Sequence, residues 1–166
     1  YPYHIYQYSS FPVPGRRPYR YGFPFLDFKF QKQFAANNFE IFHAHCPFSS
    51  GEFAFKTARK MGIPIVATFH SKYRDDFKRV VPSKAVVDYL VSKVVKFYES
   101  VDEVWVPQLS VGETLREYGY KGYFEVVDNG CEFADYPYSD SMKQAAKDEL
   151  YINKKEPLLL FVGQHI

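Results

Sequence analysis

Residues 41–71 read IFHAHCPFSSGEFAFKTARKMGIPIVATFHS. The first five residues of this stretch are an apolar-rich run typical of a short strand. Residues 65–69 (IVATF) are β-branched and continuous, as in a strand buried on both faces. The helix expected between these strands carries three small or apolar residues on one face, which are Ala54, Ala58 and Met61. A strand, a helix and a second strand in this order predict a parallel βαβ unit.

Both ends of the expected helix carry sequence signals. Ser49 and Glu52 fit a capping box, in which the serine oxygen and the glutamate carboxylate each accept a hydrogen bond from an otherwise unpaired backbone N–H group. Gly62 predicts the end of the helix, and Pro64 prevents its continuation. We therefore expect the helix to begin with a side-chain cap and to end at a glycine.

The same order of elements recurs in the second half of the chain. Ser83 can cap a long helix with rows of valine, and residues 104–106 form a short apolar strand. Ser110 and Glu113 repeat the capping-box pattern, and residues 124–127 predict a further strand. Alternating strands and helices predict an α/β fold, a Rossmann-like parallel sheet with helices on both faces.

Residues 1–30 differ from the rest of the chain because they are crowded with tyrosine and phenylalanine. Proline at their density opposes both a helix and a central strand. We expect one strand over residues 4–8 and an extended loop for the remainder. The prolines in this region beyond residue 10 are Pro12, Pro14, Pro18 and Pro24.

The composition is that of a globular protein. The chain has 166 residues, of which 46% are hydrophobic and 24% charged, and its formal net charge is +2. This charge is too small to indicate nucleic acid as a partner. Two cysteines without a C-x-x-C pattern predict a reducing, cytoplasmic setting. No apolar run approaches the roughly 18–20 residues that a transmembrane helix needs.

Polar side chains follow the ends of the four predicted strands. In open α/β sheets, ligands bind beyond the carboxyl ends of the strands. Polar groups from four loops should therefore line one rim of the sheet and form a binding crevice. In chain order these residues are His43 and His45, His70 and Ser71, Pro107 and Gln108, and Asp128, Asn129 and Gly130.

Each of these signals has a second interpretation. His43 and His45 could supply two imidazole ligands to a metal ion, but no partner with ligand spacing is evident. A structural role is the alternative, with His43 hydrogen-bonded in the core. For His70 the pattern alone favours neither function nor structure. Residues 128–130 also fit a tight turn, and Cys46 a small buried filler.

The quoted stretch resembles the acceptor domain of glycosyltransferase family 4 enzymes of the GT-B fold. That family shows a strand ending in His-x-His-x-Pro-Phe, a helix, and then Gly-Ile-Pro-hydrophobic-Ala-Thr-aromatic-His. VDEVWVPQLSVGETLREYGY (101–120) is similar to its next strand, loop and helix, and VVDNGCEF (126–133) to its Pro-Asn-Gly-Val-Asp loop. LLLFVG (158–163) looks like the first strand of the donor domain. The resemblance includes lipid-directed members such as diacylglycerol glucosyltransferases and phosphatidylinositol mannosyltransferases.

The resemblance implies two Rossmann-like domains with the reaction in the cleft between them. A hexose would pass from an NDP-sugar to a lipid or glycan acceptor with retained anomeric configuration, without a metal ion or other cofactor. His70 would be the catalytic residue, placed at the sugar and the acceptor. His45, Ser71, Asn129 and Gly130 would bind substrate around it.

The resemblance also implies an organisation in domains. Residues 1–130 would be part of the N-terminal acceptor-side domain, residues 131–140 a linker, and residues 141–166 the start of the donor-binding domain. A helix over residues 141–150 and a strand over residues 157–162 are expected in that last part. We interpret the chain as cut at both ends and expect it to be inactive alone.

Two positions depart from the family pattern. Gln164 stands where the family usually has arginine, and Asp128 where it usually has proline. Aspartate loosens the turn before Asn129 and adds a negative charge near a site meant for phosphate. This departure argues against a phosphate-binding role for Asn129.

Clusters of basic side chains have two interpretations, an ordinary solvated surface and a peripheral contact with the anionic inner face of the cell membrane. Arg16, Arg17 and Arg20 stand among the aromatic residues Tyr19, Tyr21 and Phe23. A second basic group follows His70 and comprises Lys72, Arg74, Lys78, Arg79 and Lys84. Two other functions also remain open: a metal-dependent hydrolase that uses the H-x-H pair, and a non-enzymatic α/β binding module.

Overall fold

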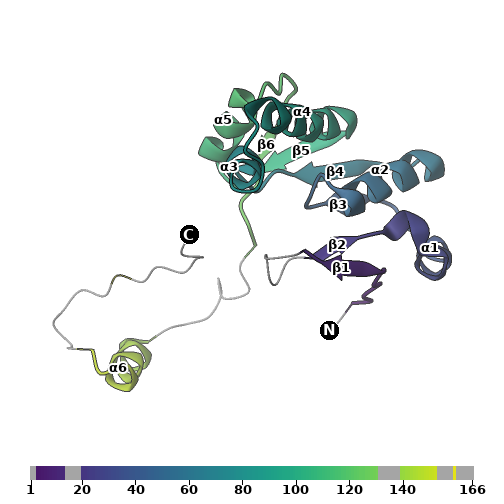
Figure 1. Cartoon of the computed structure of the whole chain (residues 1–166). Helices are drawn as coiled ribbons and strands as arrows, with labels where there is room; N and C mark the ends of the chain where they lie inside the picture. The colour runs from purple at the N-terminus through teal and green to yellow at the C-terminus, as the bar shows by residue number, and fades with distance from the viewer. Residues whose placement is uncertain (1–2, 14–19, 131–138, 153–158, 160–166) are drawn as a thin grey trace. The chain divides into compact units, whose positions relative to one another are not determined.

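The computed structural model describes residues 3–13, 20–130, 139–152 and 159. The chain divides into two compact units, Tyr1–Asn129 and Gly130–Ile166, and each is described by itself (Figure 1). None of the helices in the described ranges is long and apolar enough to cross a membrane.

The first unit contains a four-stranded parallel sheet. Its order is β3-β4-β5-β6, so neighbours along the chain are neighbours in the sheet. The register pairs Ala44 with Ala67, and Thr68 with Trp105. All four predicted strands are confirmed, and each of their ends lies within one residue of its prediction. Their bounds are β3 (Phe42–Ala44), β4 (Ile65–Thr68), β5 (Glu103–Val106) and β6 (Glu125–Val126).

Helices connect these strands, as the alternating pattern predicts, and the Rossmann-like α/β class is confirmed. The prediction of helices on both faces does not hold for the described residues, because strand order follows chain order and right-handed crossovers then place the connecting helices on one face of the sheet. Every residue of β4 is buried, as expected for a central strand. The helices are α2 (Ser49–Met61), α3 (Tyr73–Lys78), α4 (Lys84–Ser100) and α5 (Leu109–Glu117).

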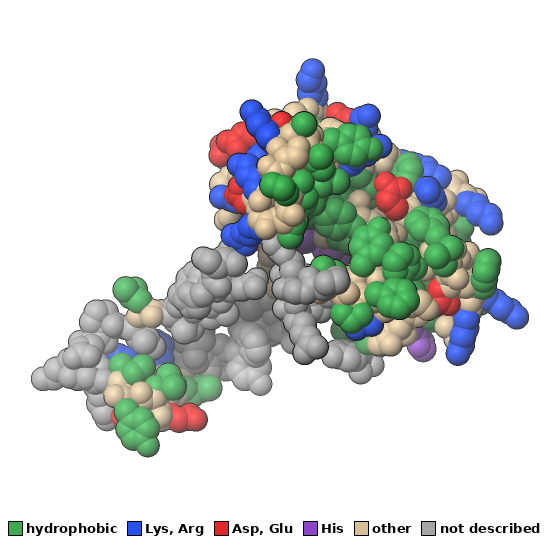
Figure 2. All heavy atoms as spheres, viewed as in Figure 1, with side chains coloured by type: hydrophobic (Ala, Val, Ile, Leu, Met, Phe, Trp, Pro, Cys, Tyr) green, Lys and Arg blue, Asp and Glu red, His purple; other side chains and the backbone are tan. Residues whose placement is uncertain are grey.

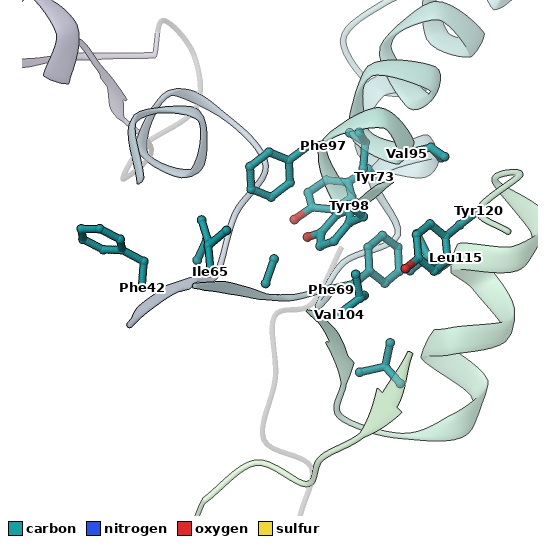
Figure 3. Close-up of a cluster of buried hydrophobic side chains, with 14 of the residues drawn as sticks. Phe42, Ile65, Phe69, Tyr73, Val95, Phe97, Tyr98, Val104, Leu115 and Tyr120 are labelled. Atoms are coloured by element: carbon teal, nitrogen blue, oxygen red, sulfur yellow. The ribbon is translucent and has the colours of Figure 1, made fainter. Parts of the chain in front are cut away.

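The hydrophobic core lies between that face of the sheet and the helices (Figure 3). Phe69 and Leu115 are fully buried, and Tyr98 is 1% exposed. The hydroxyl of Tyr98 donates to the carbonyl oxygen of Thr68 at 3.2 Å, so the polar end of this buried ring is satisfied. The sheet contributes alternate positions to the core, namely Phe42, Ala44, Ile65, Ala67, Phe69, Val104 and Val106.

The predicted capping boxes are wrong. Helix α2 has Phe48 at its N-cap, and helix α5 has Gln108, neither with a side-chain cap. Ser49 is therefore already helical, one position too late to cap. A Cβ at position 51 would lie 1.9 Å from the carbonyl oxygen of Cys46, so glycine allows the first turn of α2 to pack closely on the preceding loop.

The predicted C-terminus of α2 is correct. Gly62 adopts a left-handed conformation with φ of 68°, and its N–H group donates to the carbonyl oxygen of Ala58. Glycine is the residue that reaches this conformation at little steric cost. For α4, Ser83 occupies the predicted N-cap, but its side chain makes no capping hydrogen bond.

The N-terminal region differs from its prediction. Residues 4–8 form no strand; instead β1 (Ser10–Pro12) and β2 (Arg20–Gly22) form an antiparallel pair, followed by the 3-10 helix η1 (Pro24–Leu26). The helix α1 (Phe28–Ala35) was not predicted. It begins just beyond the last proline of this region, where proline no longer opposes a helix.

Asp27 and two phenylalanines stabilise α1. The Asp27 carboxylate accepts from the backbone N–H of Phe30 and from both the N–H and the hydroxyl of Ser9, each at 2.9 Å. These bonds lower the pKa of Asp27. Phe30 and Phe34 pack on Phe53 of α2, with ring centroids 5.2 and 5.5 Å apart. Tertiary contact with α2 therefore selects the helix.

The second unit contains the predicted helix. It is α6 (Asp140–Glu149), and the Ser139 hydroxyl caps it by accepting from the N–H of Met142 at 3.3 Å. The expected linker lies almost entirely outside the described residues, and so does the strand expected over residues 157–162, apart from Leu159.

Candidate functional site

Three histidines meet at the carboxyl ends of β3 and β4. Side chains alternate along a strand, so His43 and His45 lie on the face opposite the core residues Phe42 and Ala44. His70 follows β4 on the same side as His43 and His45. His45 Nδ1 lies 2.9 Å from His70 Nε2, and the two rings stack with centroids 5.2 Å apart and planes at 20°. The predicted convergence of these two loops is therefore present.

His43 continues the histidine cluster toward the middle of the sheet. Its Nε2 is hydrogen-bonded to the Thr68 hydroxyl at 2.7 Å, and its ring centroid lies 4.1 Å from that of His45. Trp105 of β5 makes an edge contact with His43 at 5.0 Å. The expected hydrogen bond exists, but His43 itself is exposed rather than in the core. The buried member of the pair is Thr68, which is 4% exposed.

The surroundings favour neutral imidazoles. Partial desolvation by neighbouring groups lowers the pKa of His43, and positive charge on His45 or His70 lowers it further. The pKa of His70 is lowered first by partial desolvation and then by positive charge on His45. Both values move below the ordinary value of about 6.5. Near pH 7 these two rings are therefore neutral and can act as hydrogen-bond donors and acceptors at once.

The metal interpretation requires further ligands near the histidines. Within residues 3–13, 20–130, 139–152 and 159, the His, Cys, Asp and Glu side chains form no group of three or more that could hold a metal ion. The nitrogens that face each other, on His45 and His70, are bonded to each other. In the described residues the three histidines therefore form a cluster held by hydrogen bonds and ring contacts, without the further ligands that a metal site requires.

The other predicted site residues lie further along the same edge. Ser71 is half-buried, and its carbonyl oxygen accepts from the N–H of Tyr73 at 2.9 Å where α3 begins. Asn129 is exposed and follows β6, which lies two strands from β4. Two strand spacings are roughly 10 Å, so Asn129 does not join the histidine contacts. Gly130 is exposed and belongs to the second unit. Substrate binding by Asn129 and Gly130 stays a prediction.

Sequence reasoning missed two residues of this face, Thr68 and Trp105. Thr68 anchors His43, and Trp105 covers its ring. The Trp105 indole N–H donates to Glu103 Oε1 at 2.6 Å, which holds the ring in place. The available signal was alternation, because both residues occupy strand positions that face away from the core. For Thr68 this alternation was overlooked, because the whole run IVATF was interpreted as apolar.

The basic groups expected to contact a membrane are only partly described. Arg16, Arg17 and Tyr19 lie outside the described residues, and Arg20 is exposed and bonded to Ser10. On the face of the first unit drawn in Figure 2, Lys and Arg are scattered around the margin, with apolar side chains between them.

The second basic group is partly neutralised. Three of its members form ion pairs, Arg74 with Asp88, Lys78 with Asp75, and Arg79 with Asp76. The Asp88 partner was not considered in the sequence. These pairs weaken the positive charge of this surface.

Comparisons with known proteins agree with this geometry. A family model described as Glycosyltransferase Family 4 matches residues 1–134. An alpha-monoglucosyldiacylglycerol synthase of Streptococcus pneumoniae (strain ATCC BAA-255 / R6) is 26% identical over 157 residues, which are 85% of this chain and 35% of that protein. A protein of the same name from Acholeplasma laidlawii is 24% identical over 136 residues, 75% of this chain and 34% of that protein. The chain spans about a third of the length of these curated relatives.

Proposed function

The chain belongs to glycosyltransferase family 4, and we propose that it forms the acceptor-side part of an enzyme that transfers a hexose from an NDP-sugar to a lipid acceptor. Transfer retains the anomeric configuration, and the nucleotide sugar is a co-substrate rather than a bound cofactor. Residues 1–130 form the acceptor-side domain, residues 131–140 the linker, and residues 141–166 the start of a donor-binding domain.

The observation that carries this proposal is the pair His45–His70 at the carboxyl edge of the sheet. The two adjacent imidazole rings offer hydrogen-bond donors and acceptors to hydroxyl groups, and sugars present several hydroxyls. Retaining transfer builds positive charge on the sugar ring, which a neutral imidazole tolerates better than a fixed cation does. His70 therefore positions the sugar or the acceptor and is not a covalent nucleophile.

Two further observations support a lipid acceptor. Both relatives carry names that specify glucosyldiacylglycerol synthesis. The N-terminal region also exposes many large apolar side chains, and such surfaces mark contacts with membranes or proteins. These side chains are Tyr3, Ile5, Phe11, Tyr21, Phe25, Leu26 and Phe28. A peripheral contact with an anionic membrane on its cytoplasmic side follows, with Arg20 close to the headgroups.

Sugar transfer by the full-length protein tests the function. It is incubated with UDP- and GDP-hexoses and with diacylglycerol in vesicles, and the anomeric form of the product is determined by NMR. We expect an α-glycoside of the lipid from an α-linked donor. Transfer to no lipid or glycan acceptor, or an inverted product, would contradict the proposal. Residues 1–166 alone should show no transfer, because one side of a cleft cannot orient both substrates.

Co-sedimentation with vesicles tests the membrane contact separately. The chain should bind anionic vesicles and lose this binding at high salt, since charge attraction to the surface is screened. Arg20→Gln should weaken binding, whereas Lys60→Gln, a matched change at the exposed end of α2, should not. Equal binding to neutral and anionic vesicles, or none, would reject the contact.

A further inference from the structure

His70 has two ring nitrogens, and the structure uses one of them. His70 Nε2 lies 2.9 Å from His45 Nδ1. A neutral imidazole has one N–H donor and one acceptor nitrogen. A substrate hydroxyl can therefore bond to His70 without breaking the pair only through Nδ1. The contact with His45 decides which atom of His70 is left for the substrate.

The two rings also restrict each other's protonation. If His70 Nε2–H donates to His45 Nδ1, both rings carry their proton on Nε2, which is the commoner form of a free histidine side chain. If the bond runs the other way, both protons must sit on Nδ1. The first arrangement avoids the rarer form of both rings. In that arrangement His70 Nδ1 keeps a lone pair and accepts a hydrogen bond.

The position of His45 is itself fixed by its neighbours. Its ring lies 4.1 Å from the ring of His43, and His43 is bonded to the buried hydroxyl of Thr68. This line of contacts runs from the middle of the sheet to its edge. His45 is the first residue after β3, and His70 lies two residues after β4. Because the ring of His45 is held through His43 and Thr68, it can orient the ring of His70.

From this geometry we infer that His45 is a positioning residue, which holds His70 through Nε2 and presents His70 Nδ1 as the hydrogen-bond acceptor for a substrate hydroxyl. The role in transfer rests on the proposed function. The His45–His70 hydrogen bond and the protonation of His70 Nε2 do not depend on that function, so both can be measured on the chain without any substrate.

NMR of the chain with ¹⁵N-labelled histidine tests the inference. Couplings between ring nitrogens and ring protons show which nitrogen carries the proton, at a pH where both rings are neutral. The signal of His70 is identified by its absence in His70→Gln. We expect His70 to be protonated on Nε2 alone. In His45→Phe this preference should relax toward the mixture of a free imidazole, because the acceptor is gone.

Conservative substitutions of His45 distinguish a specific loss of the hydrogen bond to His70 from a general disturbance of the structure. The amide of His45→Asn can stand near the place of Nδ1 and should preserve the protonation of His70. His45→Gln, whose amide stands near the place of Nε2, should not. His4→Phe is the matched control, since His4 is exposed and its ring contact is with Tyr6. It should leave His70 unchanged.

The outcomes are distinct. A proton on Nδ1 of His70, or signals of His70 unchanged in both His45→Phe and His45→Gln, would overturn the inference. In the full-length enzyme, His45→Phe should lower kcat roughly ten-fold or more, with a smaller change in KM, and His45→Asn should restore most of it. A normal kcat in His45→Phe would reject the role in transfer. If the His45–His70 hydrogen bond is present but the protein transfers no sugar, the proposed function is wrong and the positioning of His70 by His45 is still supported.

Discussion

The two faces of the parallel sheet differ in what they contribute, although they alternate along the same strands. One face carries the core side chains of β3 and β4 and packs on the helices, with Phe69 and Ala67 fully buried. The other face carries His43, His45 and Trp105, and the ring of His43 contacts the rings of both His45 and Trp105. Substitutions on the first face should therefore change stability, and substitutions on the second should change chemistry.

The largest effect is expected on the core face. Phe69→Ala removes a fully buried ring that contacts Tyr73, Tyr98 and Tyr118. The free energy of unfolding should fall by about 3–5 kcal/mol because a cavity remains. Denaturant unfolding measures this change. Phe28→Ala makes the same chemical change at a side chain that is 80% exposed, and should cost less than about 0.5 kcal/mol. Similar losses in the two variants would contradict the assigned core.

His70→Ala should separate the two faces most clearly. In the full-length protein, kcat of the proposed sugar transfer should fall by roughly 10²-fold or more, the scale of a lost positioned acid–base group or oriented hydrogen bond. The melting temperature of the chain should change little, because His70 is exposed. If the variant melts several degrees earlier and keeps a near-normal kcat, His70 is structural and the site assignment fails.

Thr68→Val tests the point where the two faces meet. The change keeps the shape of a residue that is 4% exposed and removes the hydroxyl bonded to His43. The free energy of unfolding should fall by about 1 kcal/mol, as for one lost hydrogen bond, and the ¹⁵N shift of His43 Nε2 should change. Thr57→Val, away from the histidines, should leave that shift unaltered. An unchanged shift in Thr68→Val would exclude the anchoring bond.

The smallest effect concerns pH. The pKa values of His43 and His70 are lowered in the folded chain, so the unfolded chain binds protons first as the pH falls. The free energy of unfolding should therefore decrease once the pH drops below the ordinary value of about 6.5. Denaturant titrations between neutral and mildly acidic pH measure the slope. In the double variant His43→Asn, His70→Asn the free energy of unfolding should change less steeply with pH than in the parent chain. An equal slope would mean that other titratable groups cause the pH dependence.

The difference between the N-terminal region and the sheet shows what a sequence pattern can reveal. The four strands and α2, α4 and α5 follow from alternation, helical periodicity and the glycine at position 62. Helix α1 does not, because its existence depends on Asp27 reaching Ser9 and on Phe30 and Phe34 packing against Phe53. Contacts between residues distant in sequence have no local periodicity, so the proline-rich context predicted a loop instead.

The start of α2 shows the same limit at the scale of single residues. Ser49 and Glu52 have the spacing of a capping box, yet the helix begins one residue too early for it. The first turn of the helix instead packs closely on the preceding loop, where Gly51 approaches the carbonyl oxygen of Cys46. A local pattern cannot contain this information, because the loop and the helix must be packed together before the clash exists.

By itself the sequence determined the Rossmann-like α/β class, the order of the strands along the chain, and the rim on which His45 and His70 lie. It could do so because the periods of strands and helices, and the common edge of parallel strands, are local or topological rules. Only the tertiary structure decided that His70 Nε2 meets His45 Nδ1, that Thr68 anchors His43, and that Trp105 covers it. Strand register and ring orientation set those contacts within fractions of an ångström, and both arise when the core on the other face of the sheet packs.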